Sequence, residues 1–434
     1  MSSPNDSPPR DRAFAPYRIP TTDEARQLLA DVLIRLQESD DRRRRRKSEA
    51  QAIHERATSA LVCDLAYRAL GEPEGWLTVE LTKALLSPSK RRAPFMTEQF
   101  ASLVKAFAAC GLVDMELGDS HVLGRRTTIR ASNALQHRIA ELEIDFDSFG
   151  RDPAFKGDPL ELRGPKTKRF IAGKVVFKAD KLPLPATAEV EHVRRQMEEI
   201  NAWLAEADLS WQGSKKLDPS LRFLKRIFNN GSMELGGRLD GGFWQQAPSN
   251  QRCTGILIDR EPIASLDFAQ SAMRMAYAQM GAEPPEGDLY NVPGLFPWRR
   301  ETKQILNALM SADSERTRFP KNSRGDIPRS WKFEEVYRFI ARHHAAIEPL
   351  FGTGAGLRFM YQESEILIRV LLRLKAEEIV ALPIHDCVLV PSSAKDIAKE
   401  AMEACFLEVT GIQGVVEIEE RAMGSPKDHS GEDL

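Results

Sequence analysis

Two apolar segments, far apart in the sequence, each lead directly into an aspartate. Residues 256–266 form two short apolar runs joined by a turn, and the second run ends at Asp267. Residues 379–384 form another such run, which leads through a histidine to Asp386. Short apolar runs bounded by turn residues are typical of buried strands. The sequence therefore predicts a sheet with a carboxylate at each of two strand ends, where sheets present functional groups to a cleft.

Two carboxylates held on a rigid sheet suggest a site for divalent cations. Hard oxygen ligands suit Mg²⁺ (or Mn²⁺), and a pair of such ions can activate an attacking hydroxyl and stabilise a leaving pyrophosphate. The 5 cysteines are scattered without a C-x-x-C pair, which argues against zinc and against a disulfide framework. A lone aspartate at a strand end is more often a turn residue or a helix cap. Support must therefore come from the rest of the chain.

A cationic helix is predicted between the two aspartates. Residues 298–307 read W-R-R-E-T-K-Q-I-L-N. On a helix, Arg299, Lys303 and Asn307 share one face because they are spaced four residues apart. A cationic face opposite two metal-binding carboxylates suits a triphosphate, although R-x-x-x-K also occurs on many surface helices.

These segments resemble motifs of family A DNA polymerases and of the single-subunit RNA polymerases of phages and mitochondria. L-D-F-A-Q-S-A-M-R at 266–274 resembles the first palm motif, D-Y-S-Q-x-E-x-R, and I-H-D-C at 384–387 resembles the H-D-E or H-D-S motif. The helix at 298–307 resembles the fingers motif R-x-x-x-K. Residues 237–252, with G-R-L, W-Q-Q-A-P and a final arginine, resemble the segment that grips the primer-template. The resemblance spans residues 220–420 and keeps the order of the motifs.

The resemblance implies roles at the reacting centre. Asp267 and Asp386 would hold the metal ions, and His385 would support the primer end. Arg299 would bind the triphosphate, and Lys303 would protonate the leaving pyrophosphate.

Other residues would contact the duplex or the sugar. The resemblance implies that Arg238 and Gln362 contact the minor groove of the duplex, and that Arg252 belongs to the primer-template segment. Ala272 replaces the family's glutamate, whose bulk excludes a ribose 2′-hydroxyl, so acceptance of ribonucleotides is expected. The fingers helix also lacks the family's Tyr-Gly pair, and no exonuclease signature precedes the palm.

The N-terminal part has a different character. Residues 1–20 are rich in Pro, Ser and Asp and are predicted to be disordered. Residues 21–145 are predicted to form a helical, winged helix-turn-helix DNA-binding domain. Its helices are expected at 77–86 and 97–110, with Gly111 at the C-cap, followed by a two-stranded hairpin.

Contact with DNA is the expected role of this domain. In winged helices the second helix enters the major groove and the hairpin contacts phosphate. Basic clusters at 42–47, 90–92, 125–126 and 166–169 fit that role. The formal net charge of −2 does not by itself indicate a nucleic-acid binder. The alternatives are a structural domain or a protein-contact winged helix.

The rest of the chain divides into three predicted segments. Residues 146–186 are predicted to be a basic linker, 187–423 a polymerase-like palm and fingers domain, and 424–434 a disordered tail. The palm segment begins with an amphipathic helix over 190–207. The fold class is therefore α+β, with a palm-and-fingers catalytic domain after a mostly helical winged-helix domain.

The sequence indicates a template-directed, two-metal nucleotidyltransferase. It would be a small DNA-dependent DNA polymerase or a primase-like polymerase from a mobile or phage-like replicon. Its partners would be a primer-template or a single-stranded template and nucleoside triphosphates. The alternative is a non-catalytic DNA-binding replication initiator or regulator with a degenerate palm. The N-terminus lacks the pattern of a signal peptide, and no apolar run could span a bilayer, so a cytoplasmic protein without a membrane partner is expected.

Overall fold

The chain forms two compact units in a computed structural model. One unit is Met1–Gly157 with Arg169–Val176, and the other is Asp158–Lys168 with Phe177–Leu434. The structure describes residues 12–40, 46–79, 81, 86, 93, 95–118, 127–152, 158–171, 174–214, 217–219 and 221–420, without the side chains of 169, 171–174 and 420. The basic clusters at 90–92 and 125–126, most of the cluster at 42–47, and the predicted tail at 424–434 lie outside these residues.

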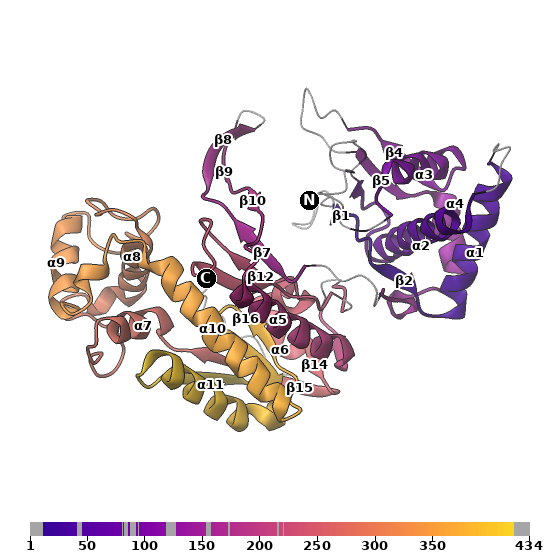
Figure 1. The fold of residues 1–434 in the computed structure, drawn as a ribbon. Helices are drawn as coiled ribbons and strands as arrows, with labels where there is room; N and C mark the ends of the chain where they lie inside the picture. The colour runs from indigo at the N-terminus through magenta and orange to yellow at the C-terminus, as the bar shows by residue number, and fades with distance from the viewer. Residues whose placement is uncertain are drawn as a thin grey trace, which may run out of the picture. The chain divides into compact units, whose positions relative to one another are not determined.

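The N-terminal unit packs helices against a sheet of strand order β1-β3-β5-β4 (Figure 1). Helix α3 buries Phe100, Leu103, Val104 and Phe107 on one face, as their helical spacing predicts. The elements of this unit are β1 (Arg12–Ala13), β2 (Arg18–Pro20), α1 (Asp23–Glu38), α2 (Ser48–Gly71), β3 (Leu77–Val79), α3 (Glu98–Ala109), β4 (Val113–Glu116), β5 (Thr127–Ala131), α4 (Asn133–Glu141) and β6 (Phe149–Arg151).

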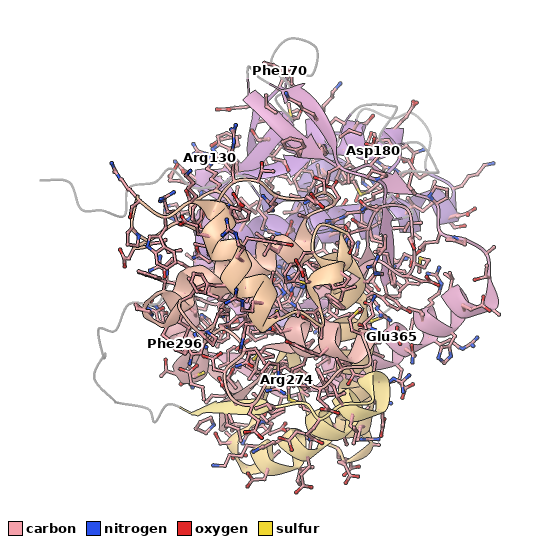
Figure 2. The ribbon with its side chains drawn as sticks, turned by 90° about the vertical axis from the view of Figure 1, so that its left-hand side faces the viewer. Arg130, Phe170, Asp180, Arg274, Phe296 and Glu365 are labelled. Carbon is pink, nitrogen blue, oxygen red and sulfur yellow. The ribbon has the colours of Figure 1, made fainter. Side chains whose placement is uncertain are left out.

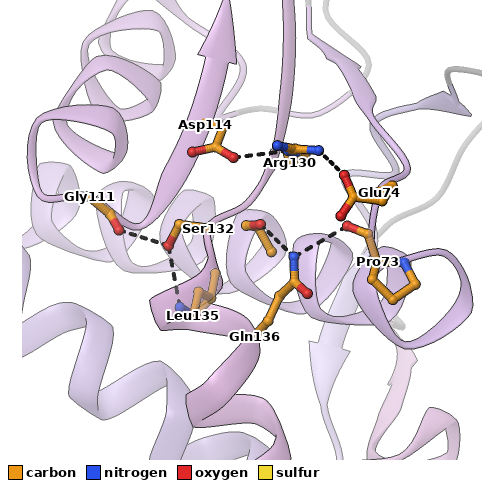
Figure 3. Close-up of polar contacts among 9 residues, drawn as sticks. Pro73, Glu74, Gly111, Asp114, Arg130, Ser132, Leu135 and Gln136 are labelled. Carbon is orange, nitrogen blue, oxygen red and sulfur yellow. Dashed lines mark hydrogen bonds and ion pairs between the residues drawn. The ribbon is translucent and has the colours of Figure 1, made fainter.

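The hairpin β4–β5 follows α3, and its arginine is neutralised locally. Arg130 pairs with Asp114 (Nε to Oδ2, 2.9 Å) and with Glu74 (Figure 3). Its guanidinium carbon also lies 4.9 Å from the centre of the Trp76 ring. Next along the chain, the Ser132 hydroxyl caps α4. Arg130 therefore does not present a free charge to a phosphate in this structure.

Asp64 of α2 organises a buried ionic cluster. Its carboxylate accepts hydrogen bonds from Arg12 Nη2 at 2.6 Å, Arg18 Nε at 2.8 Å and the Ala15 backbone N at 2.7 Å. Asp64 and Arg18 are both fully buried, and the Arg18 guanidinium carbon lies 3.5 Å from the centre of the Tyr67 ring. The prediction that residues 1–20 are disordered is therefore wrong for 12–20, because this segment is tied to α2 by its two arginines.

Two other predictions about local structure are wrong. Leu77–Val79 is a strand rather than the start of a helix, because it pairs with β5 in the sheet. The segment 146–186, predicted to be a linker, contains strands β6 to β10. These strands are short, and β6 and β7 pair with strands far along the chain, β2 and β12, so local periodicity does not reveal them.

The C-terminal unit contains a six-stranded sheet of order β11-β14-β15-β17-β16, in which β18 also pairs with β15. A second sheet has the order β10-β7-β12-β13. The strands that follow β6 along the chain are β7 (Leu160–Arg163), β8 (Thr167–Ile171), β9 (Lys174–Lys178), β10 (Lys181–Leu182), β11 (Leu209–Trp211), β12 (Lys225–Phe228), β13 (Gly236–Asp240), β14 (Ile256–Ile258), β15 (Glu261–Phe268), β16 (Leu382–Ile384), β17 (Cys387–Pro391) and β18 (Val416–Glu420). Of these, the stretch Arg169–Val176 of β8 and β9 is assigned to the N-terminal unit.

Helices cover these sheets and share one large core (Figure 1). The amphipathic helix expected at 190–207 is confirmed as α5. The helices are α5 (Ala188–Glu206), α6 (Ser249–Gly255), α7 (Ser271–Gln279), α8 (Arg299–Ser311), α9 (Phe333–His343), α10 (Ala355–Ala376) and α11 (Lys395–Thr410). The structure thus confirms a mixed helix-and-sheet fold.

Candidate functional site

The central strand β15 carries Asp267 near its C-terminal end. Asp267 lies opposite Cys387 of β17 on one side and opposite Glu417 of β18 on the other. The backbone N of Phe268 donates to the carbonyl oxygen of Asp386 at 3.3 Å. Asp267 therefore lies on β15 and Asp386 directly before the neighbouring strand β17, so each aspartate lies at a strand end, as the sequence predicts.

Asp386 lies in the two-residue turn between β16 and β17. The pair Ile384–Cys387 closes this turn, and His385 adopts a left-handed conformation with a φ of 55°. Hairpins with two-residue turns favour positive φ, but a residue other than Gly, Asn or Asp adopts it at some cost. The turn therefore holds Asp386 in a fixed place beside the end of β15.

Strand β16 is an edge strand, one of the two places, an edge or a bulge, where a proline such as Pro383 is expected within a sheet. The carbonyl oxygen of Pro383 accepts hydrogen bonds from Trp244 Nε1 at 2.9 Å and from Gln245 Nε2 at 3.2 Å. Trp244 is fully buried. The W-Q-Q segment thus supports the turn that carries Asp386.

A third carboxylate, which the sequence analysis left without a role, joins the two aspartates. Glu363 of α10 is 7% exposed, and its Oε1 accepts a hydrogen bond from Arg238 Nε of β13 at 3.4 Å. Burial and the negative charge of Asp386 raise the pKa of Glu363 to about 7, against the opposing effect of Arg238. The available signal was its position directly after Gln362, a residue that the resemblance had already placed at the site.

A buried arginine fixes α10 in this position. Arg226 of β12 is fully buried, and its Nη2 donates to Ser364 Oγ at 2.6 Å and to Glu365 Oε1 at 2.8 Å. Its Nε donates to the carbonyl oxygen of Gly237 at 3.3 Å. Arg226 therefore ties the middle of α10 to β13, next to the Glu363–Arg238 pair.

The electrostatic field at the carboxylates favours a cation. Partial burial and, next, the charge of Asp386 raise the pKa of Asp267 to about 7, whereas Lys303 lowers it. Asp267 keeps one side exposed to solvent although protein surrounds the rest. The negative charge of Asp386 thus acts on both Asp267 and Glu363. A cation that binds among them relieves their mutual repulsion.

Substitution of Glu363 tests this repulsion. An acid whose pKa is raised by folding contributes its stability below its ordinary pKa, here 4.5, and loses it as pH rises through about 7. Glu363→Gln should therefore stabilise the chain at pH 8 by on the order of 2 kcal/mol relative to its effect at pH 5. The measurement is thermal unfolding in EDTA at both pH values.

The matched control is Glu334→Gln on α9, whose side chain is exposed and pairs with Arg338. Its effect should be the same at both pH values. An equal effect of Glu363→Gln at pH 5 and pH 8 would show that the third carboxylate is not electrostatically strained.

The cationic helix is confirmed as α8, and its two cations border one tyrosine. Arg299 pairs with Asp288, and its guanidinium carbon lies 5.6 Å from the centre of the Tyr290 ring. Lys303 Nζ lies 5.8 Å from the same ring centre. Burial opposes the ionisation of Asp288, but the hydrogen bond from Arg299 prevails and lowers its pKa. Gln270 Nε2 donates to Asp288 Oδ1 at 3.0 Å, which links this loop to the end of β15.

For the remaining predicted site residues, the structure gives the local surroundings of each side chain. His385 has a lowered pKa, because it is partly buried and Arg238 lies near it. Arg252 donates to the carbonyl oxygen of Ala247 at 3.2 Å. Gln362 has a buried Oε1 without a hydrogen-bond partner, and Ala272 lies in the first turn of α7, partly exposed.

The possible metal ligands are few. Among the described residues no group of three or more His, Cys, Asp and Glu side chains is arranged to hold a metal ion. The donors that the structure offers at this place are carboxylate oxygens, which fit Mg²⁺ or Mn²⁺ in kind. As for membrane-spanning segments, no helix within the residues that the structure describes has the length and apolar character needed to cross a membrane.

No family model matches the sequence, and neither does any curated protein. Among solved structures, the chain is similar to the POL domain of Pol1 from M. smegmatis in complex with DNA primer-template and dNTP, with 9% sequence identity and a TM-score of 0.32. The match covers 93% of this chain and 66% of that chain, so this protein spans less than two thirds of the length of that domain. A TM-score this low does not establish a common fold.

Proposed function

We propose that the chain is a template-directed, metal-dependent nucleotidyltransferase. The observation that carries this proposal is the convergence of Asp267, Asp386 and Glu363 at one end of the central sheet, with Lys303 close enough to lower the pKa of Asp267. Three mutually repelling carboxylates beside a lysine are suited to bind cations together with a polyphosphate.

Asp267 and Asp386 are the proposed metal ligands. When bound, a pair of Mg²⁺ or Mn²⁺ ions supplies activation of the attacking hydroxyl and stabilisation of the leaving pyrophosphate. The sheet and the tight turn orient the two carboxylates in advance. Glu363 adds a third carboxylate near the two aspartates, and the positive charge of Arg238 partly neutralises it.

Arg299 and Lys303 are the proposed triphosphate ligands. Arg299 is paired with Asp288, and a nucleotide would compete with that carboxylate for the guanidinium. Lys303 is proposed to donate a proton to the leaving pyrophosphate. Arg238, Gln362 and Arg252 are proposed to contact the duplex.

Two further residues are proposed to contact the primer terminus and the sugar of the incoming nucleotide. His385, in the turn beside Asp386, is proposed to support the primer terminus. Ala272 is proposed to leave room for a ribose 2′-hydroxyl, so both deoxynucleotides and ribonucleotides are expected as substrates.

The N-terminal unit is proposed to be a DNA-binding winged helix. Helix α3 followed by the β4–β5 hairpin supports this assignment, and the exposed Lys105 lies on α3. The competing function is a DNA-binding replication initiator or regulator without catalysis. Titration calorimetry with Mg²⁺ separates the two, because a scaffold does not require a cation at Asp267 and Asp386.

The test is extension of a labelled primer-template by the purified full-length chain. Parallel reactions contain Mg²⁺ or Mn²⁺ with deoxynucleotides or ribonucleotides, and an EDTA reaction and a primer-free reaction serve as controls. Metal-dependent, template-matched products are expected with both sugars, and Ala272→Glu should reduce ribonucleotide use more than deoxynucleotide use. The absence of product in all reactions would reject the proposal in favour of the non-catalytic DNA binder.

A further inference from the structure

Strands β8 and β9 form a two-stranded ribbon of their own. No other strand in the described part of the chain pairs with them, and the ribbon extends beyond β7 and β10 (Figure 1). An isolated ribbon buries little, because both of its faces and both of its edges meet solvent. Side chains on it are therefore available to a partner.

Large apolar side chains lie open on this ribbon. Phe170 is 75% exposed and Phe177 is 64% exposed. Val175 and Val176 are exposed as well, and Phe170 lies near the end of the ribbon in Figure 2. Scattered apolar residues on a surface need no explanation, but a cluster that includes two phenylalanines marks an interaction site.

Strand register brings the two phenylalanines to one face. Thr167 Oγ1 donates to the carbonyl oxygen of Lys178 at 3.1 Å, so the ends of the two strands that adjoin β7 and β10 lie side by side. In an antiparallel ribbon, counting from this pair towards Ile171 and Lys174 puts Lys168 opposite Phe177, and Phe170 opposite Val175. Side chains alternate between the faces of a strand, so these four residues share one face.

The charge of the ribbon is of one sign. From Gly164 to Ala179 the sequence has no Asp or Glu, and its cations are Lys166, Lys168, Arg169, Lys174 and Lys178. Lys166, Lys168 and Lys178 are exposed. Just beyond the ribbon, by contrast, Lys181 is paired with Glu161. The exposed aromatic face is therefore set in a positive field that suits a polyanion.

We propose that the β8–β9 ribbon binds single-stranded nucleic acid, with bases stacked on Phe170 and Phe177, phosphates beside Lys168 on the same face, and a further phosphate at the ribbon edge beside Lys178, which belongs to the opposite face. A single strand offers both chemistries, since its bases have free faces, whereas in a duplex the base faces are covered by neighbouring pairs. The inference rests on the proposed function for its context, because a template strand is single-stranded, but it uses no residue of the carboxylate site.

The first experiment is fluorescence anisotropy of a labelled single-stranded oligonucleotide with the full-length chain in EDTA, without nucleotides. Phe170→Ala with Phe177→Ala should weaken binding about tenfold or more. Phe170→Leu with Phe177→Leu keeps the apolar bulk and removes the rings, so it should weaken binding similarly. The matched control is Ile397→Ala with Leu407→Ala on α11, whose side chains are 49% and 44% exposed, and it should leave the affinity unchanged.

The second experiment measures the dependence of affinity on salt. Lys168→Ser with Lys178→Ser should reduce the slope of log K against log salt concentration by about 1.4, since each phosphate contact to a single strand contributes about 0.7. Lys375→Ser with Lys399→Ser removes the same charge from α10 and α11 and should leave the slope unchanged.

Three outcomes would overturn the proposal: unchanged single-strand affinity in the ribbon variants, an effect on duplex binding alone, or an effect only on binding to vesicles of anionic lipid. The readout is independent of catalysis. A chain that extends no primer but loses single-strand affinity through these substitutions supports the ribbon and rejects the proposed function. Conversely, if the chain extends primers but its single-strand affinity is the same with and without the ribbon substitutions, the proposed function is supported and the ribbon proposal is rejected.

Discussion

Replacing Asp267 by asparagine is expected to reduce primer extension by at least about 10³-fold, and Asp386→Asn is expected to do the same. Asparagine keeps the shape of the side chain but removes the charge proposed to hold a divalent cation. The loss corresponds to about 4 kcal/mol of transition-state stabilisation. Burial and repulsion raise the pKa of Asp267, so a neutral side chain there should also leave the fold intact or more stable above pH 7.

The measurement is the single-turnover rate of nucleotide addition at saturating template, with thermal unfolding of each variant in parallel. Asp259→Asn is the matched control. Asp259 lies in the turn between β14 and β15, at the opposite end of the same strand, with a φ of 52° that asparagine also tolerates. Extension that survives both Asp267→Asn and Asp386→Asn would place the chemistry elsewhere in the chain.

The parts of this site that the sequence predicts are those encoded by local patterns. Apolar runs mark β14, β15 and β16, and the proline in β16 indicates an edge strand or a bulge, of which the structure has the edge strand. The four-residue spacing of Arg299 and Lys303 predicts that they share one face of a helix, and both lie beside Tyr290. In each of these places the local preference of the chain agrees with the fold.

The parts that the sequence could not predict depend on partners far along the chain. Glu363 is separated from Arg238 by 125 residues. Its position next to Gln362 indicates that it lies near the site, but not that its side chain is buried and paired with an arginine. The pairing of Arg299 with Asp288 is closer in sequence, yet it depends on the loop that Gln270 holds. Burial and ion pairing of single side chains are tertiary properties, which periodicity does not report.

The prediction of disorder for the N-terminal segment is wrong for residues 12–20 for the same reason, because their order depends on a distant partner. The composition of the segment, rich in Pro, Ser and Asp, is typical of disorder, but Arg12 reaches a carboxylate 52 residues away. The buried carboxylate of Asp64 thus accounts for the order of residues 12–20. Its removal is expected to have a large effect on the stability of the N-terminal unit.

Asp64→Ala is expected to lower the unfolding free energy of the N-terminal unit by about 3–5 kcal/mol. Asp64 is fully buried and neutralises Arg18, which is also fully buried, and Arg12. Removing the carboxylate leaves two guanidinium groups without their counter-charge, and this costs far more than the intact pair contributes. Hydrogen–deuterium exchange of full-length chain, followed on peptides of α2, measures the loss within this unit.

Two further variants separate the buried charge from a general loss of contacts. Asp31→Ala removes a partly exposed carboxylate that pairs with Arg138, and exposed pairs contribute little, so exchange in α2 should hardly change. Replacing the cluster as a whole, with Arg12→Met, Arg18→Met and Asp64→Leu, should recover much of the lost stability, because no buried charge then remains unpaired. If Asp64→Ala has no larger effect than Asp31→Ala, the order of residues 12–20 has another source than this ionic cluster.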